Sequence, residues 1–424
     1  RRGRPPARCE AAAVDWEAKA RGLELELAEL RRRLPRAEEA PCYTVVLTGG
    51  PCAGKTTVMR ILKEKLENLG FLVLMVPEAA TLFFSAGVKF LDFLPLGDNA
   101  TLSVQSQITR MQIHIENSFR DLARVQGRPT VILCDRGAMD GKAYVPQELW
   151  TLILEDLGAT ESMVRDKRYN AVLHLVTAAR GAEKFYTLQQ AEDVGARSET
   201  LEEARAQDEK TLRCWVGHPH LFILDNSTDF KGKTQRAVDR VLNLVGKAVP
   251  GHTLRKFRVP HMPLADLAEA LRRAGVDTFQ VFRSEQLFLS PRRRIRMRCT
   301  EDGNQASYYM QEELEGGTVV ERSIGGREYL SLRSAARERH IPIFEKQLVV
   351  FEWGTHVLEV NIFSNPEPVC IVEVEAESRD AAISLPAFLQ GPGPGPREVT
   401  CDPGFDSYAI SERLRGSASG TFAR

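Results

Sequence analysis

The chain lacks an excess of either charge, and this limits its partners. It contains 57 Lys and Arg residues and 57 Asp and Glu residues among 424, so its formal net charge is zero. A protein that coats nucleic acid carries a positive balance, and we therefore expect no nucleic-acid partner. No apolar run approaches the ~20 residues that a bilayer-spanning helix needs. No stretch has the character of a secretory signal, and we expect no transmembrane segment.

Paired cysteines are also missing. The eight cysteines are widely scattered, and none forms a CxxC pair. This pattern favours reduced thiols in a cytoplasmic protein over a disulfide framework. The triplet His218-Pro219-His220 has no Cys or acidic residue close by in the sequence, so it predicts a loop and not a metal site.

The chain is long enough to predict two folded domains. Residues 41–248 alternate strand-like and helix-like segments, which predicts a parallel sheet with helices on both faces, an α/β fold. Residues 249–385 switch to short alternating strands and predict an α+β domain built on an antiparallel β-barrel. Residues 1–40 predict a charged helical or disordered extension. Residues 386–424, which open with GPGPGPRE, predict a disordered tail.

A phosphate-binding loop is the strongest motif. It comprises Gly49, Gly50, Pro51, Cys52, Ala53, Gly54, Lys55, Thr56 and Thr57. The strand-like run YTVVL precedes it and an amphipathic helical pattern follows, the order that a P-loop NTPase needs. The loop amides face the phosphates, Lys55 reaches the β- and γ-phosphates, and Thr56 holds Mg²⁺. The alternative is a chance match in a glycine-rich turn.

Two acids follow predicted strands in this domain. Asp135 comes directly after TVILC and Glu78 follows FLVLMVP. Acids at the carboxyl ends of parallel strands lie beside the ligand, so both are candidate catalytic residues and Asp135 is also a candidate Mg²⁺ ligand. Solvated loop acids are the alternative reading for both.

Two further candidates point to the nucleotide. Arg197 lies in an arginine-rich segment, 180–213, that has the pattern of a mobile flap able to close on phosphates. A solvated amphipathic helix is the alternative. Asn226 follows the strand-like run LFIL and is a candidate contact to the base. The residues do not separate GTP from ATP.

A cationic ladder marks the second domain. Arg292, Arg294, Arg296 and Arg298 alternate with other residues, so on a strand they share one face. Lys256 and Arg258 form a similar pair, and Glu373, Glu375 and Glu377 form an acidic ladder. Inside a barrel such arginines need an anion, and phosphate suits them. The alternative is a basic surface strand that binds RNA or nothing specific.

The motifs also resemble known families. TGGPCAGKTT, VPEAAT, LCDRG, ARSETLEEA and LDNSTDFKGK resemble the AAA-type P-loop module shared by the nicotinamide riboside kinase part of NadR and the TRPL translocation defect protein 14 family. Residues 252–378 resemble a CYTH, or triphosphate-tunnel, domain. Lys256, RIRMR, Lys346, Glu359, Glu373 and Glu375 match its strands. His252, Leu254 and Asn361 stand where that family has acids, which implies phosphate binding without triphosphate hydrolysis.

The combination of these two modules is similar to the TRPL translocation defect protein 14 family. The resemblance implies GTP with Mg²⁺ at the P-loop and a phosphatidylinositol phosphate held by Lys256, Arg258, Arg292, Arg294, Arg296, Arg298 and Lys346. It also implies a cytoplasmic protein, peripheral on membranes, that supports transport of a membrane protein or ion channel. Two alternatives are a small-molecule, nucleoside-type kinase and a weak triphosphatase. Enzymatic activity therefore stays open.

Overall fold

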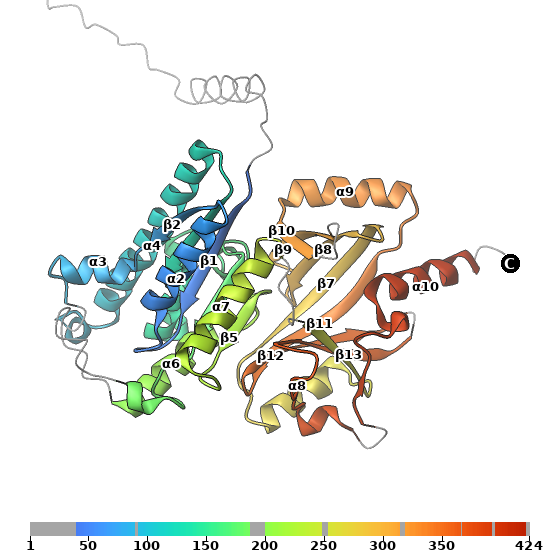
Figure 1. The fold of residues 1–424 in the computed structure, drawn as a ribbon. Helices are drawn as coiled ribbons and strands as arrows, with labels where there is room; N and C mark the ends of the chain where they lie inside the picture. The colour runs from blue at the N-terminus through green and yellow to red at the C-terminus, as the bar shows by residue number, and fades with distance from the viewer. Residues whose placement is uncertain are drawn as a thin grey trace, which may run out of the picture. The chain divides into compact units, whose positions relative to one another are not determined.

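The computed structural model describes residues 40–89, 92–186, 200–247, 253–313, 319–365, 367–391 and 395–420. The predicted extension at 1–39 and the candidate Arg197 lie outside these residues. Residues Cys42–Arg424 form one compact unit, and it contains two β-sheets, each surrounded by helices (Figure 1). No helix in the described ranges is long and apolar enough to cross a membrane.

The first sheet is parallel and five-stranded. Its strands are β1 (Cys42–Thr48), β2 (Leu72–Val76), β3 (Thr130–Asp135), β4 (Ala171–Leu175) and β5 (Leu221–Leu224). Its spatial order is β2-β3-β1-β4-β5. Central β1 therefore has the acid-bearing strands β2 and β3 on one side, and β4 and β5 on the other.

Helices cover both faces of this sheet, as the alternating pattern predicts. They are α2 (Lys55–Asn68), α3 (Ala79–Ser85), α4 (Asp98–Gln126), α5 (Gln147–Asp156), α6 (Leu201–Trp215) and α7 (Phe230–Leu244). One core joins alternate strand residues such as Val45 to α2 and α7. The other joins Val46 and its neighbours to α5 and α6, with Trp150 and Trp215 fully buried. Because side chains alternate along a strand, the continuous apolar runs supply both cores.

The second sheet is antiparallel. It contains β6 (Thr253–Val259), β7 (Phe279–Ser290), β8 (Arg293–Thr300), β9 (Ala306–Glu313), β10 (Val319–Ser323), β11 (Phe344–Trp353), β12 (His356–Phe363), β13 (Val369–Ala376) and β14 (Arg397–Glu398). The order is β10-β9-β8-β7-β11-β12-β13-β6-β14. The antiparallel prediction is confirmed. Strand pairing in the described ranges runs from β10 to β14 without joining them, so a closed CYTH barrel remains a proposal.

The two faces of this sheet differ in chemistry. One face packs two apolar cores, the first against α8 (Leu264–Arg273) and the second against α9 (Gly326–Glu338). The opposite face carries the polar ladders, because its strands alternate apolar and charged residues. Arg294 pairs in register with Gln311, and Glu359 with Glu373. This polar face, called the inner face below, lines the cavity of the candidate site.

The carboxyl-terminal segment corrects the prediction of a disordered tail. Within its described part, β14 pairs with β6, and α10 (Ser407–Gly420) follows. Ile410 is buried in a cluster with Phe344 and Phe363, and the Tyr408 ring packs edge-on against Phe288. Composition alone favours disorder here because the few apolar residues are widely spaced. They become ordering contacts only when the sheet supplies the other half of the core.

Candidate functional site

The P-loop lies between β1 and α2, as its motif predicts. Gly49 has φ 129° and Gly54 has φ 87°, both in the left-handed region that favours glycine. A side chain on Gly49 would overlap the Leu175 carbonyl oxygen, and one on Gly54 would overlap the Phe230 ring. The loop thus needs glycine at these positions for both dihedral angle and space.

Lys55 and Thr56 open helix α2. The Lys55 ammonium donates to the carbonyl oxygens of Gly49 and Gly50, at 3.1 Å each. Thr56 is exposed beside it and Thr57 is half-buried. A helix amino terminus with free amides and a lysine attracts phosphate, so the loop is built for an anion.

The rest of the loop is tied to its surroundings. Ala53 lies in the core, Cys52 is exposed with φ 53°, and the Pro51 carbonyl accepts a 2.6 Å hydrogen bond from the Thr177 hydroxyl. These contacts fix the backbone from which the amides point.

Asp208 on α6 is a buried clamp on the loop. Its Oδ1 accepts from the Gly50 amide at 2.6 Å and from the Thr177 amide at 3.2 Å. His174 Nε2 lies 3.3 Å from the same oxygen, in a fully buried position. Burial acts to raise the pKa of Asp208, but His174 and the two amides outweigh it and leave the pKa lowered. The carboxylate is therefore held ionised directly beneath the phosphate site.

Asp135 and Glu78 lie at the carboxyl ends of β3 and β2, on one side of the loop. Burial raises the pKa of Asp135, with Lys55 opposing and Glu78 adding to the rise. Glu78 is already engaged, since Arg136 Nε lies 2.7 Å from its Oε1 and the Thr81 hydroxyl donates to its Oε2 at 2.7 Å. Asp135 is thus the acid left facing the lysine, and Glu78 orients Arg136.

Arg136 is a residue that the sequence reading passed over. It has φ 63°, which is unusual for a residue other than glycine. It is 8% exposed, and its Nη1 has no hydrogen-bond partner. A left-handed backbone and a buried donor without a partner, beside the phosphate loop, make Arg136 a further candidate site residue.

The donor set fits Mg²⁺ carried by a nucleotide. Thr56 supplies a hydroxyl and Asp135 a carboxylate, the oxygen ligands that Mg²⁺ prefers together with phosphate oxygens. Glu78 and Asp140 add to the negative potential at Asp135, which favours a cation there. Within the described ranges, no cluster of three His, Cys, Asp or Glu residues could hold a metal by protein ligands alone. The ion would therefore arrive with its phosphates.

Asn226 lies on the opposite side of the loop, after β5, and its side chain makes hydrogen bonds within the protein. Its amide nitrogen donates to the carbonyls of Thr177 and Arg180, at 2.8 and 2.7 Å. Its oxygen accepts from the buried Lys233 ammonium at 2.8 Å. Asn226 therefore braces the loops around the site, and both polar atoms of its side chain take part in these contacts.

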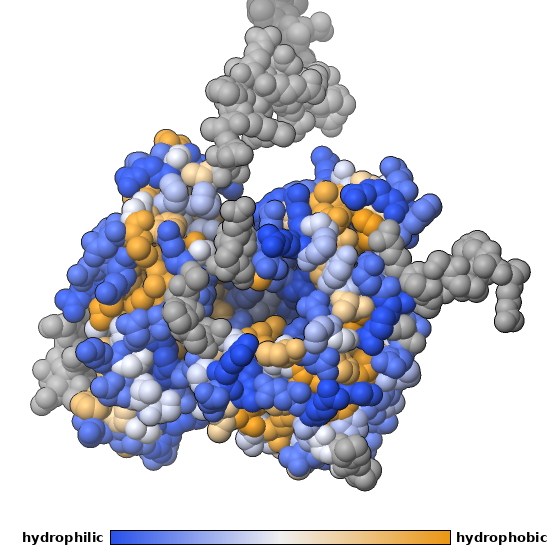
Figure 2. All heavy atoms as spheres, turned by 45° about the vertical axis from the view of Figure 1, so that its right-hand side comes forward, coloured by the Kyte–Doolittle hydropathy of each residue, from blue (hydrophilic) through white to orange (hydrophobic). Residues whose placement is uncertain are grey.

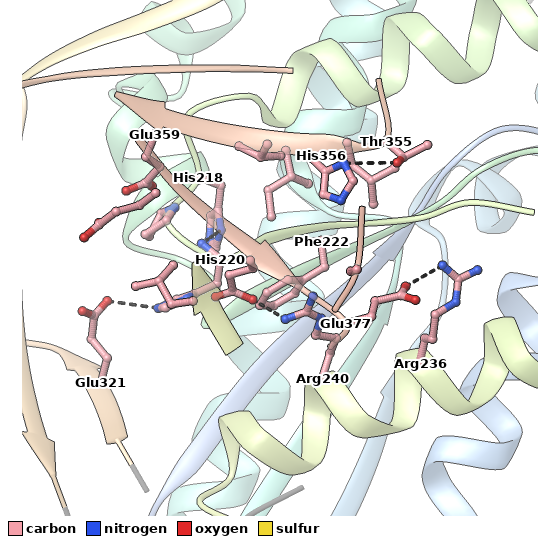
Figure 3. A pocket seen from close by; sticks show the side chains of 18 of the residues that line it. His218, His220, Phe222, Arg236, Arg240, Glu321, Thr355, His356, Glu359 and Glu377 are labelled. Atoms are coloured by element: carbon pink, nitrogen blue, oxygen red, sulfur yellow. Dashed lines mark hydrogen bonds and ion pairs between the residues drawn. The ribbon is translucent and has the colours of Figure 1, made fainter. Parts of the chain in front are cut away.

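The polar inner face of the second sheet lines a cavity of about 370 Å³. Figure 2 shows a hollow in the surface bordered largely by hydrophilic residues. The cavity also receives residues from β5 and α7 of the first sheet (Figure 3). Its charged lining comprises His218, His220, Arg236, Arg240, Arg294, Arg296, His356, Asp225, Glu321, Glu359, Glu373, Glu375 and Glu377.

The predicted ladder is only partly inside. Arg294 and Arg296 line the cavity, and Arg298 is buried against the Phe282 ring, 4.3 Å from its centroid. The prediction that Arg292 belongs to the ladder is wrong, because Arg292 lies exposed in the turn before β8. The alternation of side chains that holds along a strand does not extend into a turn, so Arg292 does not share the face of Arg294 and Arg296. Arg258 is exposed and sits over the Phe405 ring.

Four cations in or beside the cavity are paired with carboxylates. Arg296 lies 3.0 Å from Glu321, Lys256 lies 3.3 Å from Glu373, and Arg236 lies 2.7 Å from Glu377. Arg240 pairs with Glu375. Among the described residues, two of the seven cations that the sequence assigned to a ligand, Lys256 and Arg296, thus have a carboxylate partner.

Three cations keep capacity for an anion. Arg294 donates to Gln311, and burial followed by Arg296 lowers its pKa. Burial, with Arg296 and Arg294 adding to it, lowers the pKa of Lys346 to about 8. Arg298 Nε and Nη1 have no hydrogen-bond partner. Depressed pKa values and unpartnered donors both indicate positive charge that an anion would stabilise.

His220 is another residue whose role the sequence reading missed. Its Nε2 contacts Glu321 at 3.0 Å, so the His218-Pro219-His220 loop reaches the second sheet. Glu321 lies about a hundred residues away along the chain, and no local pattern links the two. The same holds for Asp208, which reads as one more acid in a charged helix.

One comparison with known proteins, a match to a family model, covers the first sheet. Residues 44–233 match the model of the AAA domain family. No curated protein gives a significant match. Among solved structures, the PH1012 protein from Pyrococcus horikoshii OT3 is 12% identical, with 32% of this chain and 82% of that chain covered and a TM-score of 0.22. A conserved hypothetical protein from Pyrococcus furiosus is 15% identical, with 41% and 91% covered and a TM-score of 0.21. The chain therefore carries an AAA-type P-loop domain, which supports nucleotide binding, within residues 44–233.

Proposed function

We propose that this protein binds a purine nucleotide with Mg²⁺ at the P-loop and a multiply phosphorylated anion on the inner face of its second sheet. The loop geometry carries the first half, since Lys55 and Thr56 stand at the amino terminus of α2, after a glycine-rich loop whose backbone is held by Asp208 and Thr177. GTP is the proposed nucleotide, with ATP as the alternative. This preference rests on the resemblance to the TRPL translocation defect protein 14 family.

Calorimetry with MgGTP, MgGDP and MgATP tests the nucleotide half. Lys55→Ala should abolish binding because it removes the positive charge that neutralises the β- and γ-phosphates. Lys63→Ala is the matched control, since Lys63 lies on the same helix, is 44% exposed and pairs only with Glu67 in the described structure. Equal binding by wild type and Lys55→Ala would contradict the proposal.

The unpaired charge of Arg294, Arg298 and Lys346 supports the anion half. We propose a phosphatidylinositol phosphate headgroup as that anion, and with it a cytoplasmic protein, peripheral on membranes, that regulates transport of a membrane protein or ion channel. A CYTH-like tunnel is the fold proposed for this sheet. The headgroup, the membrane role and the cargo rest on the family resemblance.

Flotation on vesicles with and without phosphatidylinositol phosphates tests this half. Arg294→Ala/Arg296→Ala should lose binding, whereas Arg292→Ala should keep it because that side chain lies in an exposed turn. Soluble inositol phosphates in the same assay separate headgroup binding from attachment to the bilayer. Equal flotation of wild type and the double variant would remove this half of the proposal.

A nucleoside-type kinase is the second candidate, and Asp135 is the observation that favours it. Its pKa is raised by burial, and it faces Lys55, which suits a base that takes a proton from a hydroxyl acceptor. A panel of nucleosides incubated with MgATP or MgGTP would yield a phosphorylated product, and Asp135→Asn would suppress it. A panel without product would leave nucleotide binding as the function.

A further inference from the structure

An exposed aromatic ring lies against the P-loop on the side opposite the acids. Phe230 is the first residue of α7 and is 43% exposed. Its ring lies against Gly54, where it fills the space that a side chain on that glycine would need. None of the described apolar clusters includes Phe230. An exposed ring held against the last glycine of the loop calls for an explanation beyond core packing.

The sheet order fixes which part of a nucleotide would meet this ring. The loop follows central β1, and Asp135 and Glu78 follow β3 and β2 on one side. Those acids and Lys55 mark the end of the γ-phosphate and Mg²⁺. The nucleoside then extends toward β4 and β5, and Phe230 follows β5.

Two polar side chains that follow β5 are already engaged within the protein. The Asn226 side chain is used by Thr177, Arg180 and Lys233. Asp225 accepts from Arg236 at 2.8 Å and from the Ser227 hydroxyl at 2.6 Å. Asp225 Oδ1 and both polar atoms of the Asn226 side chain are thus engaged, and Phe230 offers a flat apolar surface on the same side of the loop.

We propose that Phe230 is the platform on which the nucleotide base stacks, and that it sets a preference for purines over pyrimidines. The inference deepens the proposed nucleotide function and rests on it. Stacking accepts any base with a sufficient π-face. Guanine and adenine should therefore bind with similar strength at this contact, and the smaller pyrimidine rings should bind more weakly.

Calorimetry with MgGTP, MgATP, MgCTP and inorganic tripolyphosphate tests the platform. Tripolyphosphate has the phosphates but no base. Phe230→Ala should weaken binding of the purine nucleotides by roughly 5- to 150-fold and leave tripolyphosphate unchanged, while Phe230→Tyr should keep the wild-type values. Phe84→Ala is the matched control, because Phe84 is 40% exposed on α3 of the same domain.

Each outcome decides the inference. Equal loss for nucleotides and tripolyphosphate would mean that Phe230 only supports the loop, and would overturn the platform. Unchanged purine affinity in Phe230→Ala would overturn it as well. A wild-type protein that binds neither nucleotide nor tripolyphosphate would instead refute the proposed function, so the two failures are distinguishable.

Discussion

Removal of the Asp208 carboxylate should both destabilise the fold and weaken nucleotide binding. This side chain is 2% exposed and lies on α6, yet it accepts hydrogen bonds from the amides of Gly50 and Thr177. Two loops therefore depend on one buried charge. Because Gly50 belongs to the P-loop, a loss of this clamp reaches the phosphate site directly.

The magnitude follows from the contacts. A hydrogen bond to a charged group contributes about 1.5–3 kcal/mol, and an unsatisfied buried donor costs about 1–3 kcal/mol. Asp208→Ala leaves two amides and His174 without their partner, so we expect a loss of about 3–5 kcal/mol in the free energy of unfolding. Asp208→Asn keeps one acceptor oxygen and should lose about 1–2 kcal/mol. Nucleotide affinity should fall at least about tenfold for Asp208→Ala, since the Gly50 amide is no longer oriented.

Urea unfolding and calorimetry with MgGTP measure the two effects. Glu209→Ala is the matched control, because Glu209 is the next residue on α6 and pairs at the surface with Arg213. It should change stability by about 0.5 kcal/mol or less. If Asp208→Ala unfolds like the control and binds nucleotide like wild type, Asp208 does not hold the P-loop in place.

Three further predictions follow from the same structure. Gly49→Ala should cost about 2–4 kcal/mol in urea unfolding and abolish nucleotide binding, because a side chain there meets a carbonyl oxygen; Gly87→Ala, with φ 99° and open space, should cost only about 1 kcal/mol. Binding of inositol phosphates should weaken as pH rises through about 8, where Lys346 loses its proton, and Lys346→Arg should remove this dependence; a wild-type profile flat from pH 7 to 9 would exclude Lys346 from the site. Burial lowers the pKa of His220, but the Glu321 carboxylate outweighs burial and leaves that pKa raised. The His220–Glu321 pair therefore stabilises the fold fully below pH ~6.5, and this contribution is lost as the pH rises through the pKa of His220 in the folded protein. His220→Gln should therefore cost about 1 kcal/mol at pH 5.5 and little at pH 9, and equal losses at both would contradict the pairing.

Much of the first sheet could be predicted from local pattern. The strand-like runs YTVVL, FLVLMV, TVILC and LFIL coincide within one residue at each end with β1, β2, β3 and β5, because a short continuous apolar run between turns is typical of a buried strand. The P-loop needs neighbouring residues only, which is why its motif predicted the loop so fully.

The second sheet was harder to predict because its chemistry depends on register. Alternation predicted which residues share a face, and Arg294, Arg296 and Glu373 do line one cavity. It could not reveal that Glu321 pairs with Arg296 and Glu373 with Lys256, or that Arg292 falls in a turn. Ion pairs between strands follow from distances that sequence spacing does not contain.

The sequence by itself determined the phosphate loop, the strand and helix content and the separation of charge into ladders, because each depends on residues within a few positions of one another. The tertiary structure decided which groups are free to act. It brought Asp208 into contact with the Gly50 amide, placed the Lys233 ammonium where it donates to Asn226, and packed Phe230 against Gly54. These pairs are separated by many residues along the chain, and only packing of one element on another places them in contact.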